Sequence, residues 1–164
     1  MELSPYDLDV LLLAAIKSEI ESKAVYLKLA KKVKNALLKD KLEFLSKEEE
    51  KHRQVIEEIF MNHFPDEKLV IPKKTPVPLP ELQITDENMP ISNVLKSAMD
   101  AEKAANEFYT SLSTRFPDDT KVKNTLLYFA KMELGHYKLL EIEKDGMERF
   151  EEADVYWPMV HVGP

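Results

Sequence analysis

Two short segments of the sequence place a glutamate three residues before a histidine. Glu49 and His52 do so in the segment EEEKH, and Glu133 and His136 in the segment MELGH. On a helix, residues three apart share one face and lie one turn from each other, so each pair presents a carboxylate and an imidazole together. Carboxylate oxygens with one imidazole suit iron(II), manganese(II) or zinc. A single pair is a weak signal, because acidic helices contain it often, so further ligands are needed to indicate a metal site.

The sequence contains further candidates because it is internally duplicated. Glu19 and Tyr26 in the first half correspond to Glu102 and Tyr109 in the second half, 83 residues further on. The segment with the first Glu-x-x-His pair corresponds to the segment with the second pair, 84 residues further on. Around these residues, Leu, Ile, Ala and Phe recur every three or four positions, which marks one inward face on each of four helices. The chain is therefore two copies of one helical hairpin.

Each of these apolar faces carries a glutamate near its middle, and two of them add a histidine. Burying an unpaired charge is very costly, and four carboxylates in one core would repel one another strongly. Two divalent cations would balance the four negative charges. The sequence therefore predicts a site for two metal ions, best suited to iron, with manganese and zinc as alternatives. The predicted ligands are Glu19, Glu49, His52, Glu102, Glu133 and His136.

Four helices must position these ligands, and their ends follow from local start and stop signals. Ser4 and Pro5 provide the N-terminal signal of the first helix. Gly146 provides the C-terminal signal of the last. The expected helices span about residues 4–34, 36–64, 91–116 and 117–145.

The segment between the second and third helices has a different composition. It contains most of the prolines in the chain, so it cannot be helical, and its length suits a crossover between two hairpins. The predicted fold class is all-α: a ferritin-like four-helix bundle in which two of the helices carry one glutamate each and the other two carry Glu-x-x-His. A single domain, 1–164, comprises a first hairpin at 1–64, the crossover at 65–90, a second hairpin at 91–145 and a tail at 146–164.

Composition narrows the class of function. The 164 residues include no cysteine, which excludes disulfides, thiolate nucleophiles and cysteine-ligated iron centres. The formal net charge of -7 comes from interleaved lysines and glutamates, so we expect no nucleic-acid partner. No apolar run is long enough to span a membrane, and the N-terminus lacks the basic residues of an export signal. We therefore expect a cytoplasmic protein with no membrane partner.

These segments resemble the rubrerythrin branch of the ferritin-like superfamily. The similar stretches are SEIESKAVYLKLA and EEEKH in the first half, and DAEKAANEFYTSL and MELGH in the second. The resemblance extends over about residues 8–145. It implies that Glu49 and Glu133 bridge the two metals, that each histidine caps one metal, and that Glu19 and Glu102 are terminal or redox-dependent ligands. It also implies hydrogen bonds to carboxylates across the site from two further residues, Tyr26 and Tyr109.

The resemblance implies an oxidoreductase that reduces hydrogen peroxide, or that oxidises iron(II) with oxygen, in the response to oxidative stress. Two departures from the family pattern bear on this. Ala105 occupies the position of an additional glutamate, which puts the ligand switching associated with that acid in question. The C-terminal rubredoxin domain of the family is missing, so electrons would come from a separate, rubredoxin-type donor.

Other functions and assemblies stay open at this point. The same ligands would suit a dimanganese catalase, a ferritin-like iron-storage protein, or a structural protein that holds zinc or no metal. We expect a homodimer. The crossover either completes the bundle within one chain or swaps a hairpin with the partner, and the six ligands assemble in both cases.

Five further glutamates fall off the inward faces, and two further histidines lack partners at ligand spacing. We expect solvated positions for five glutamates and a structural or exposed position for two histidines. The segment 156–159 is too apolar for a free tail, so we expect it to pack on the bundle or on a second subunit. The five glutamates and two histidines are Glu21, Glu48, Glu50, Glu141, Glu143, His63 and His161.

Overall fold

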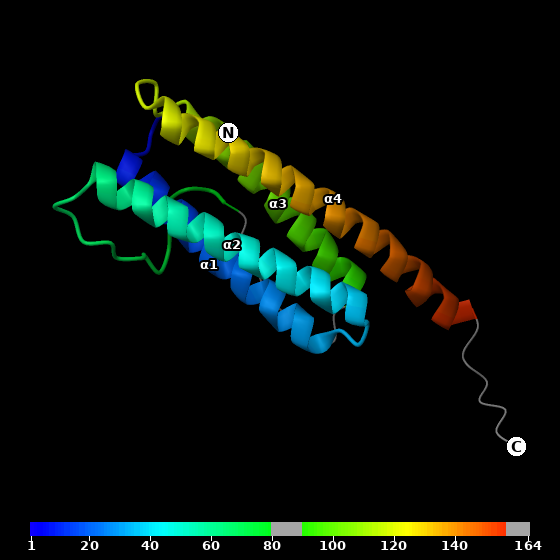
Figure 1. Cartoon of the computed structure of the whole chain (residues 1–164). Helices are drawn as coiled ribbons and strands as arrows, with labels where there is room; N and C mark the ends of the chain where they lie inside the picture. Colours follow the sequence, from blue (N-terminus) through cyan, green and yellow to red (C-terminus); the bar gives the residue numbers. More distant parts are fainter. Residues whose placement is uncertain (80–89, 157–164) are drawn as a thin grey trace, which may run out of the picture.

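The part of the chain that the structure describes forms four long helices, which pair as two hairpins (Figure 1). The computed structural model describes residues 1–79 and 90–156, with side chains described as far as residue 149. Within these residues, α1 pairs with α2 and α3 pairs with α4. The predicted all-α bundle of two hairpins is thus confirmed. The helices are α1 (Leu8–Lys32), α2 (Ala36–His63), α3 (Ile91–Ser113) and α4 (Thr120–Tyr156).

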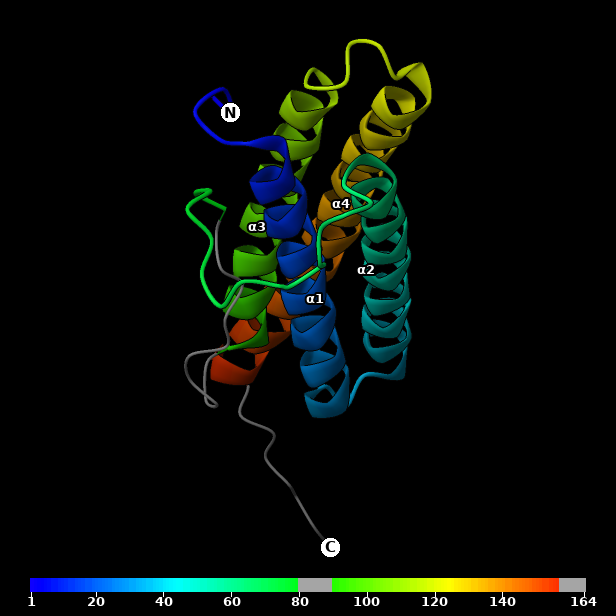
Figure 2. The ribbon, with the colours of Figure 1, turned by 90° about the vertical axis from the view of Figure 1, so that its left-hand side faces the viewer.

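The two hairpins face each other in opposite orientations. α1 lies beside α3 and runs antiparallel to it, and α2 has the same relation to α4 (Figure 2). The first part of the crossover, 65–79, returns along the outside of α1, where Val77 is buried in the core. Because the halves are copies placed head to tail, corresponding residues of the duplication meet near the middle of the bundle.

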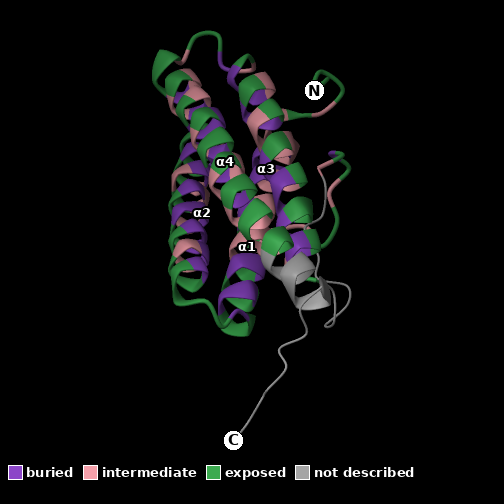
Figure 3. Cartoon of the chain, turned by 90° about the vertical axis from the view of Figure 1, so that its right-hand side faces the viewer, coloured by how far each residue is buried: buried purple, intermediate pink, exposed green. Residues whose placement is uncertain are grey.

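The core consists of two apolar clusters with a polar layer between them. One cluster contains Leu12, Phe60 and Phe108 and lies toward the α3–α4 turn. The other contains Leu42 and Leu140 and lies toward the α1–α2 turn. The buried faces of all four helices point inward in Figure 3. None of the helices in the described residues has the length and apolarity needed to cross a bilayer.

The start of α1 differs from the prediction. The N-cap is Asp7 and not Ser4, because the residues before it are held in a turn. The backbone N–H of Ser4 donates to the Glu2 carboxylate (2.9 Å), and the Arg115 guanidinium donates to the carbonyls of Leu3 and Tyr6 (2.8 and 3.1 Å). The N-terminal stretch is therefore tied to the end of α3.

The ends of the second hairpin also differ from the prediction. α3 ends at Ser113, three residues early, and its last turn closes through short-range backbone hydrogen bonds. α4 does not end at Asp145 but continues through Gly146 to Tyr156. Gly146 has no positive φ, and Met147 beyond it packs against the second apolar cluster. A glycine inside a helix weakens it only modestly, and this packing offsets the cost.

α4 begins at Thr120, three residues later than predicted, and its first turn provides a stability test. Asp119 caps the helix, because its Oδ1 accepts a hydrogen bond from the backbone N–H of Val122 (2.9 Å). We expect Asp119→Ala to lower the free energy of unfolding by about 1 kcal/mol, measured by urea denaturation. Asp119→Asn keeps a capping oxygen and should lose much less, and Asp118→Ala at the exposed neighbouring position is the control. Equal losses in all three variants would contradict this role.

Candidate metal centre

The polar layer contains all six predicted ligands. α1 and α3 contribute one glutamate each, and α2 and α4 contribute a glutamate and a histidine each. All six are buried although their neighbours along each helix face are apolar. They are Glu19, Glu49, His52, Glu102, Glu133 and His136.

The six residues form two overlapping groups. In each group, one ligand atom from each of three glutamates and one histidine lies within 4.8 Å of all the others. Glu49 and Glu133 belong to both groups, as two bridging carboxylates would. Glu19 and His52 complete one group, and the other is completed by the corresponding pair in the second half, Glu102 and His136.

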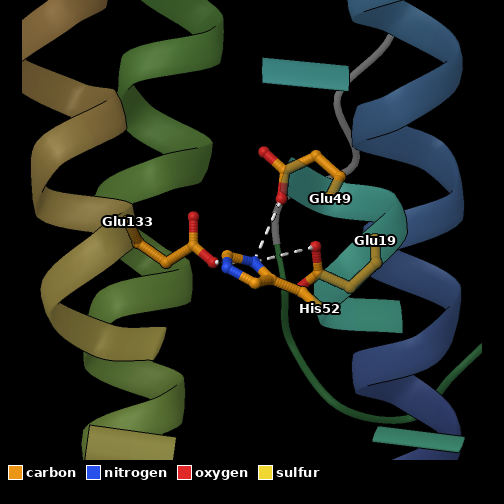
Figure 4. Close-up of side chains that lie close together, drawn as sticks. All are labelled: Glu19, Glu49, His52 and Glu133. Atoms are coloured by element: carbon orange, nitrogen blue, oxygen red, sulfur yellow. Dashed lines mark ion pairs between the residues drawn. The ribbon is translucent and has the colours of Figure 1, made fainter. Parts of the chain in front are cut away.

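The separations within the groups are close to those of atoms that share a metal ion. His52 Nδ1 lies 2.9 Å from Glu133, 3.4 Å from Glu49 and 3.7 Å from Glu19 (Figure 4). His136 Nδ1 lies 3.1 Å from Glu133 and 3.4 Å from Glu49. Metal–ligand bonds of about 2.0–2.2 Å hold neighbouring ligand atoms roughly 3.0–3.5 Å apart. The cage therefore fits two cations of this size.

Several buried atoms of the cage have no hydrogen-bond partner among the residues that the structure describes. They are Oε1 of Glu49, Oε1 of Glu133 and both ring nitrogens of His52. A buried polar atom without a partner costs roughly 1–3 kcal/mol, and more if it is charged. Cations between these atoms would supply the missing interactions, so the donor set fits a pair of hard or intermediate divalent metals such as iron(II) or manganese(II).

Two tyrosines connect the cage across the hairpins. The Tyr26 hydroxyl on α1 donates to Oε1 of Glu102 on α3, and the Tyr109 hydroxyl on α3 donates to Oε1 of Glu19 on α1. Burial and the nearby glutamates raise the pKa of both tyrosines, so both hydroxyls keep their protons. Each bond orients one outer carboxylate and leaves its second oxygen toward the cage.

Comparison with known proteins agrees with this geometry. Residues 11–144 match the family model described as Rubrerythrin. The chain belongs to the rubrerythrin family. A solved structure of a hypothetical protein from Pyrococcus furiosus is 33% identical, with a TM-score of 0.83, and the match covers 91% of this chain and 95% of that one. No curated protein gives a significant match.

The acids of this rubrerythrin-family site differ in their affinity for protons. Burial and the charge of Glu49 raise the pKa of Glu19 and of Glu102 well above the usual value. Burial also acts to raise the pKa of Glu49 and of Glu133, but the facing imidazoles outweigh it and lower both. Burial alone would lower the pKa of His52, yet the surrounding carboxylates raise it to about 12.

Metal binding should therefore release protons. Without cations, the raised pKa of Glu19 and of Glu102 favours their protonated forms, and the raised pKa of both histidines favours imidazoliums beside Glu49 and Glu133. Two divalent cations require all six ligands in their deprotonated forms, so binding should release protons, up to about four per chain near pH 7. Calorimetry in buffers with different ionisation enthalpies measures this number. Release of fewer than about two protons would contradict the protonation described here.

Sequence reasoning missed one polar contact at the level of the site. The Asn106 side chain on α3 donates to the backbone carbonyl of Ala130 on α4 (2.5 Å). Asn106 lies one turn after Glu102, and Ala130 lies one turn before Glu133. The duplication could have drawn attention to it, because Asn106 corresponds to Lys23, which forms an ion pair with Glu50 in the other hairpin (2.9 Å).

Asn106 should hold the α3 and α4 ligands at the right separation. We expect Asn106→Leu to weaken metal binding about 10-fold, measured by competition with a chromophoric chelator. Lys23→Met removes only a partly exposed ion pair, worth at most about 1 kcal/mol of stability, and should leave metal affinity nearly unchanged. Equal metal affinity of the two variants would argue against a positioning role for Asn106.

Glu48 was predicted to be solvated, and this prediction was wrong. Glu48 is not solvated: it is only 8% exposed, and its carboxylate accepts from the Lys51 ammonium one turn later (2.5 Å). Glu50 and Glu143 are half-buried in ion pairs. His63 is exposed, as expected, with Nδ1 bonded to a backbone carbonyl. His161 and 157–159 lie outside the described residues.

Ala105 occupies the position at which the rubrerythrin pattern has an additional glutamate. Ala105 is partly buried and packs against the apolar cluster that contains Phe108. A methyl group at this point contributes to packing and offers no metal ligand. Within the described residues, the cage consists of the six ligands already named.

Proposed function

We propose that this protein is a rubrerythrin-type oxidoreductase that reduces hydrogen peroxide to water with electrons from a separate donor protein. The observation that carries the proposal is the buried cage in which Glu49 and Glu133 are shared between two equivalent metal-binding groups. Two iron(II) ions held there would supply the two electrons of the reaction H2O2 + 2 e⁻ + 2 H⁺ → 2 H2O. The nearness of the two positions allows both electrons to reach one peroxide.

The protein's own residues have three tasks in this reaction. Six ligands hold two cations in a neutral environment, since four carboxylates balance four positive charges. Tyr26 and Tyr109 keep the outer carboxylates in place through their hydroxyl protons. The apolar clusters on both sides keep bulk water from the centre, which strengthens each electrostatic interaction within it.

Iron(II) oxidation by oxygen is the second candidate, because the same cage would hold the same two ions. Iron storage and dimanganese catalase use related ligand sets. The absence of cysteine means that the chain carries no rubredoxin centre, so we expect a rubredoxin-type partner to return the electrons. We also expect a homodimer, although one chain supplies all six ligands of the site.

The reaction can be tested with protein loaded anaerobically with iron(II). We expect about two irons per chain, rapid oxidation of both by one equivalent of peroxide, slower oxidation by oxygen, and re-reduction by a rubredoxin-type donor. Absorption of carboxylate-bridged iron(III) in the near ultraviolet follows each step. Faster oxidation by oxygen would favour the iron(II) oxidase. Evolution of oxygen by manganese-loaded protein, or retention of many irons per chain, would favour catalase or storage instead.

The tyrosines provide a test at single residues. We expect Tyr26→Phe and Tyr109→Phe each to slow peroxide-dependent iron oxidation about 10-fold, because each leaves an outer carboxylate without its hydrogen bond. Tyr128→Phe removes a hydroxyl from a tyrosine that is exposed on α4 and serves as the matched control. Stopped-flow absorption measures the rates. Unchanged rates in both site variants, with iron content preserved, would contradict this role.

A further inference from the structure

The two metal positions have closely matched ligand shells. Each offers one histidine, one outer glutamate and the two shared glutamates. His52 Nδ1 lies 2.9 and 3.4 Å from Glu133 and Glu49, and His136 Nδ1 lies 3.1 and 3.4 Å from the same two residues. Any difference between the positions must therefore come from the residues around the ligands.

The aromatic surroundings of the two histidines differ. The Phe129 ring lies against the His52 ring, with centroids 4.3 Å apart and planes inclined by 34°. Phe129 also makes an edge contact with Tyr109, 5.7 Å between centroids, so the two aromatic rings enclose His52 together. In the duplication, the position of Phe129 corresponds to Leu45 in the other half. Leu45 is thus the aliphatic counterpart of Phe129, and within the described residues the one ring contact of His136 is with His52.

The two histidine side chains also differ in exposure, and His52 is the more enclosed of the two. The His52 side chain is 1% exposed, and both of its ring nitrogens are buried. The His136 side chain is 6% exposed. A small opening matters here, because release of a bound metal requires water or a competing ligand to replace the protein ligands one at a time. The apolar shell around a metal site controls this access.

We propose that the two metal positions are kinetically unequal: the position capped by His136 exchanges its metal with solution faster than the position capped by His52, and Phe129 sets the difference. Enclosure by Phe129 and Tyr109 prevents the His52 ring from turning away from its metal. The His136 ring lacks this aromatic enclosure and is slightly more exposed, although its Nδ1 is hydrogen-bonded to Glu133 (3.1 Å). This inequality requires only the metal centre and not the redox reaction, so it can hold whichever substrate the protein uses.

Cadmium-113 provides a readout without any redox chemistry. Protein loaded with two cadmium ions per chain should give two cadmium resonances. Replacing one histidine identifies its resonance, since His136→Gln keeps a neutral oxygen ligand and should shift the resonance of the His136 position most. After addition of excess chelator, we expect that resonance to disappear about 10-fold faster than the other.

Variants at the two corresponding positions test the role of the ring. Phe129→Leu should accelerate loss of the His52-side metal about 10-fold and make the two rates about equal, and Leu45→Phe should slow loss of the His136-side metal. The double variant Phe129→Leu with Leu45→Phe should reverse the order. Phe60→Leu also removes a buried ring, but two turns from His52, and serves as the control for general loosening of the core.

The order in which the two cadmium resonances disappear decides between the outcomes. Equal loss of both resonances in the wild-type protein, or earlier loss at the His52 position, would overturn it. So would Phe129→Leu releasing metal no faster than Phe60→Leu. If Phe129→Leu fails to fold, Leu45→Phe alone decides, since slower release at the His136 position is expected only if the ring controls exchange.

Discussion

The fold depends on a solution to one electrostatic problem, the burial of four carboxylates at the centre of a helical bundle. Isolated charges in apolar surroundings cost several kcal/mol each, so they require protons, imidazoles or cations beside them. Here all three are available. Two of the acids take protons readily, two face imidazoles, and the spacing of all six ligands suits cations. The apolar clusters above and below this layer supply the favourable burial that makes such a centre tolerable.

The duplication makes the centre possible. A single hairpin brings only two glutamates and one histidine to one level, which leaves each metal group incomplete. The opposite orientation of the hairpins lets Glu133 complete the His52 group and Glu49 complete the His136 group. The tyrosine hydroxyls cross between the hairpins in the same reciprocal way. The hairpins are therefore joined at their middle by the residues that bind the metals, which links assembly of the bundle to the chemistry of the site.

Much of this arrangement could be predicted from sequence, for a physical reason. Helical periodicity and the duplication together place each ligand at a known height along its helix, so the convergence of the six side chains follows from the residue numbers.

Features that depend on contacts remote in sequence could not be predicted. The start of α1 depends on Arg115, which has no sequence relation to residues 3–6. The continuation of α4 through Gly146 depends on the packing of Met147, and the bond from Asn106 ends on a backbone carbonyl that any residue type would present. Glu48 is buried because a neighbouring lysine compensates its charge, which periodicity alone does not consider.

We expect one cage to hold two metal ions that share Glu49 and Glu133. X-ray absorption at the iron edge of protein loaded anaerobically with iron(II) tests it most directly. We predict about two irons per chain, a first shell of oxygen with about one nitrogen per iron, and an iron–iron scattering contribution at roughly 3.5–4 Å. A single iron per chain, or two irons with no iron–iron scattering within about 4 Å, would contradict a shared, carboxylate-bridged centre.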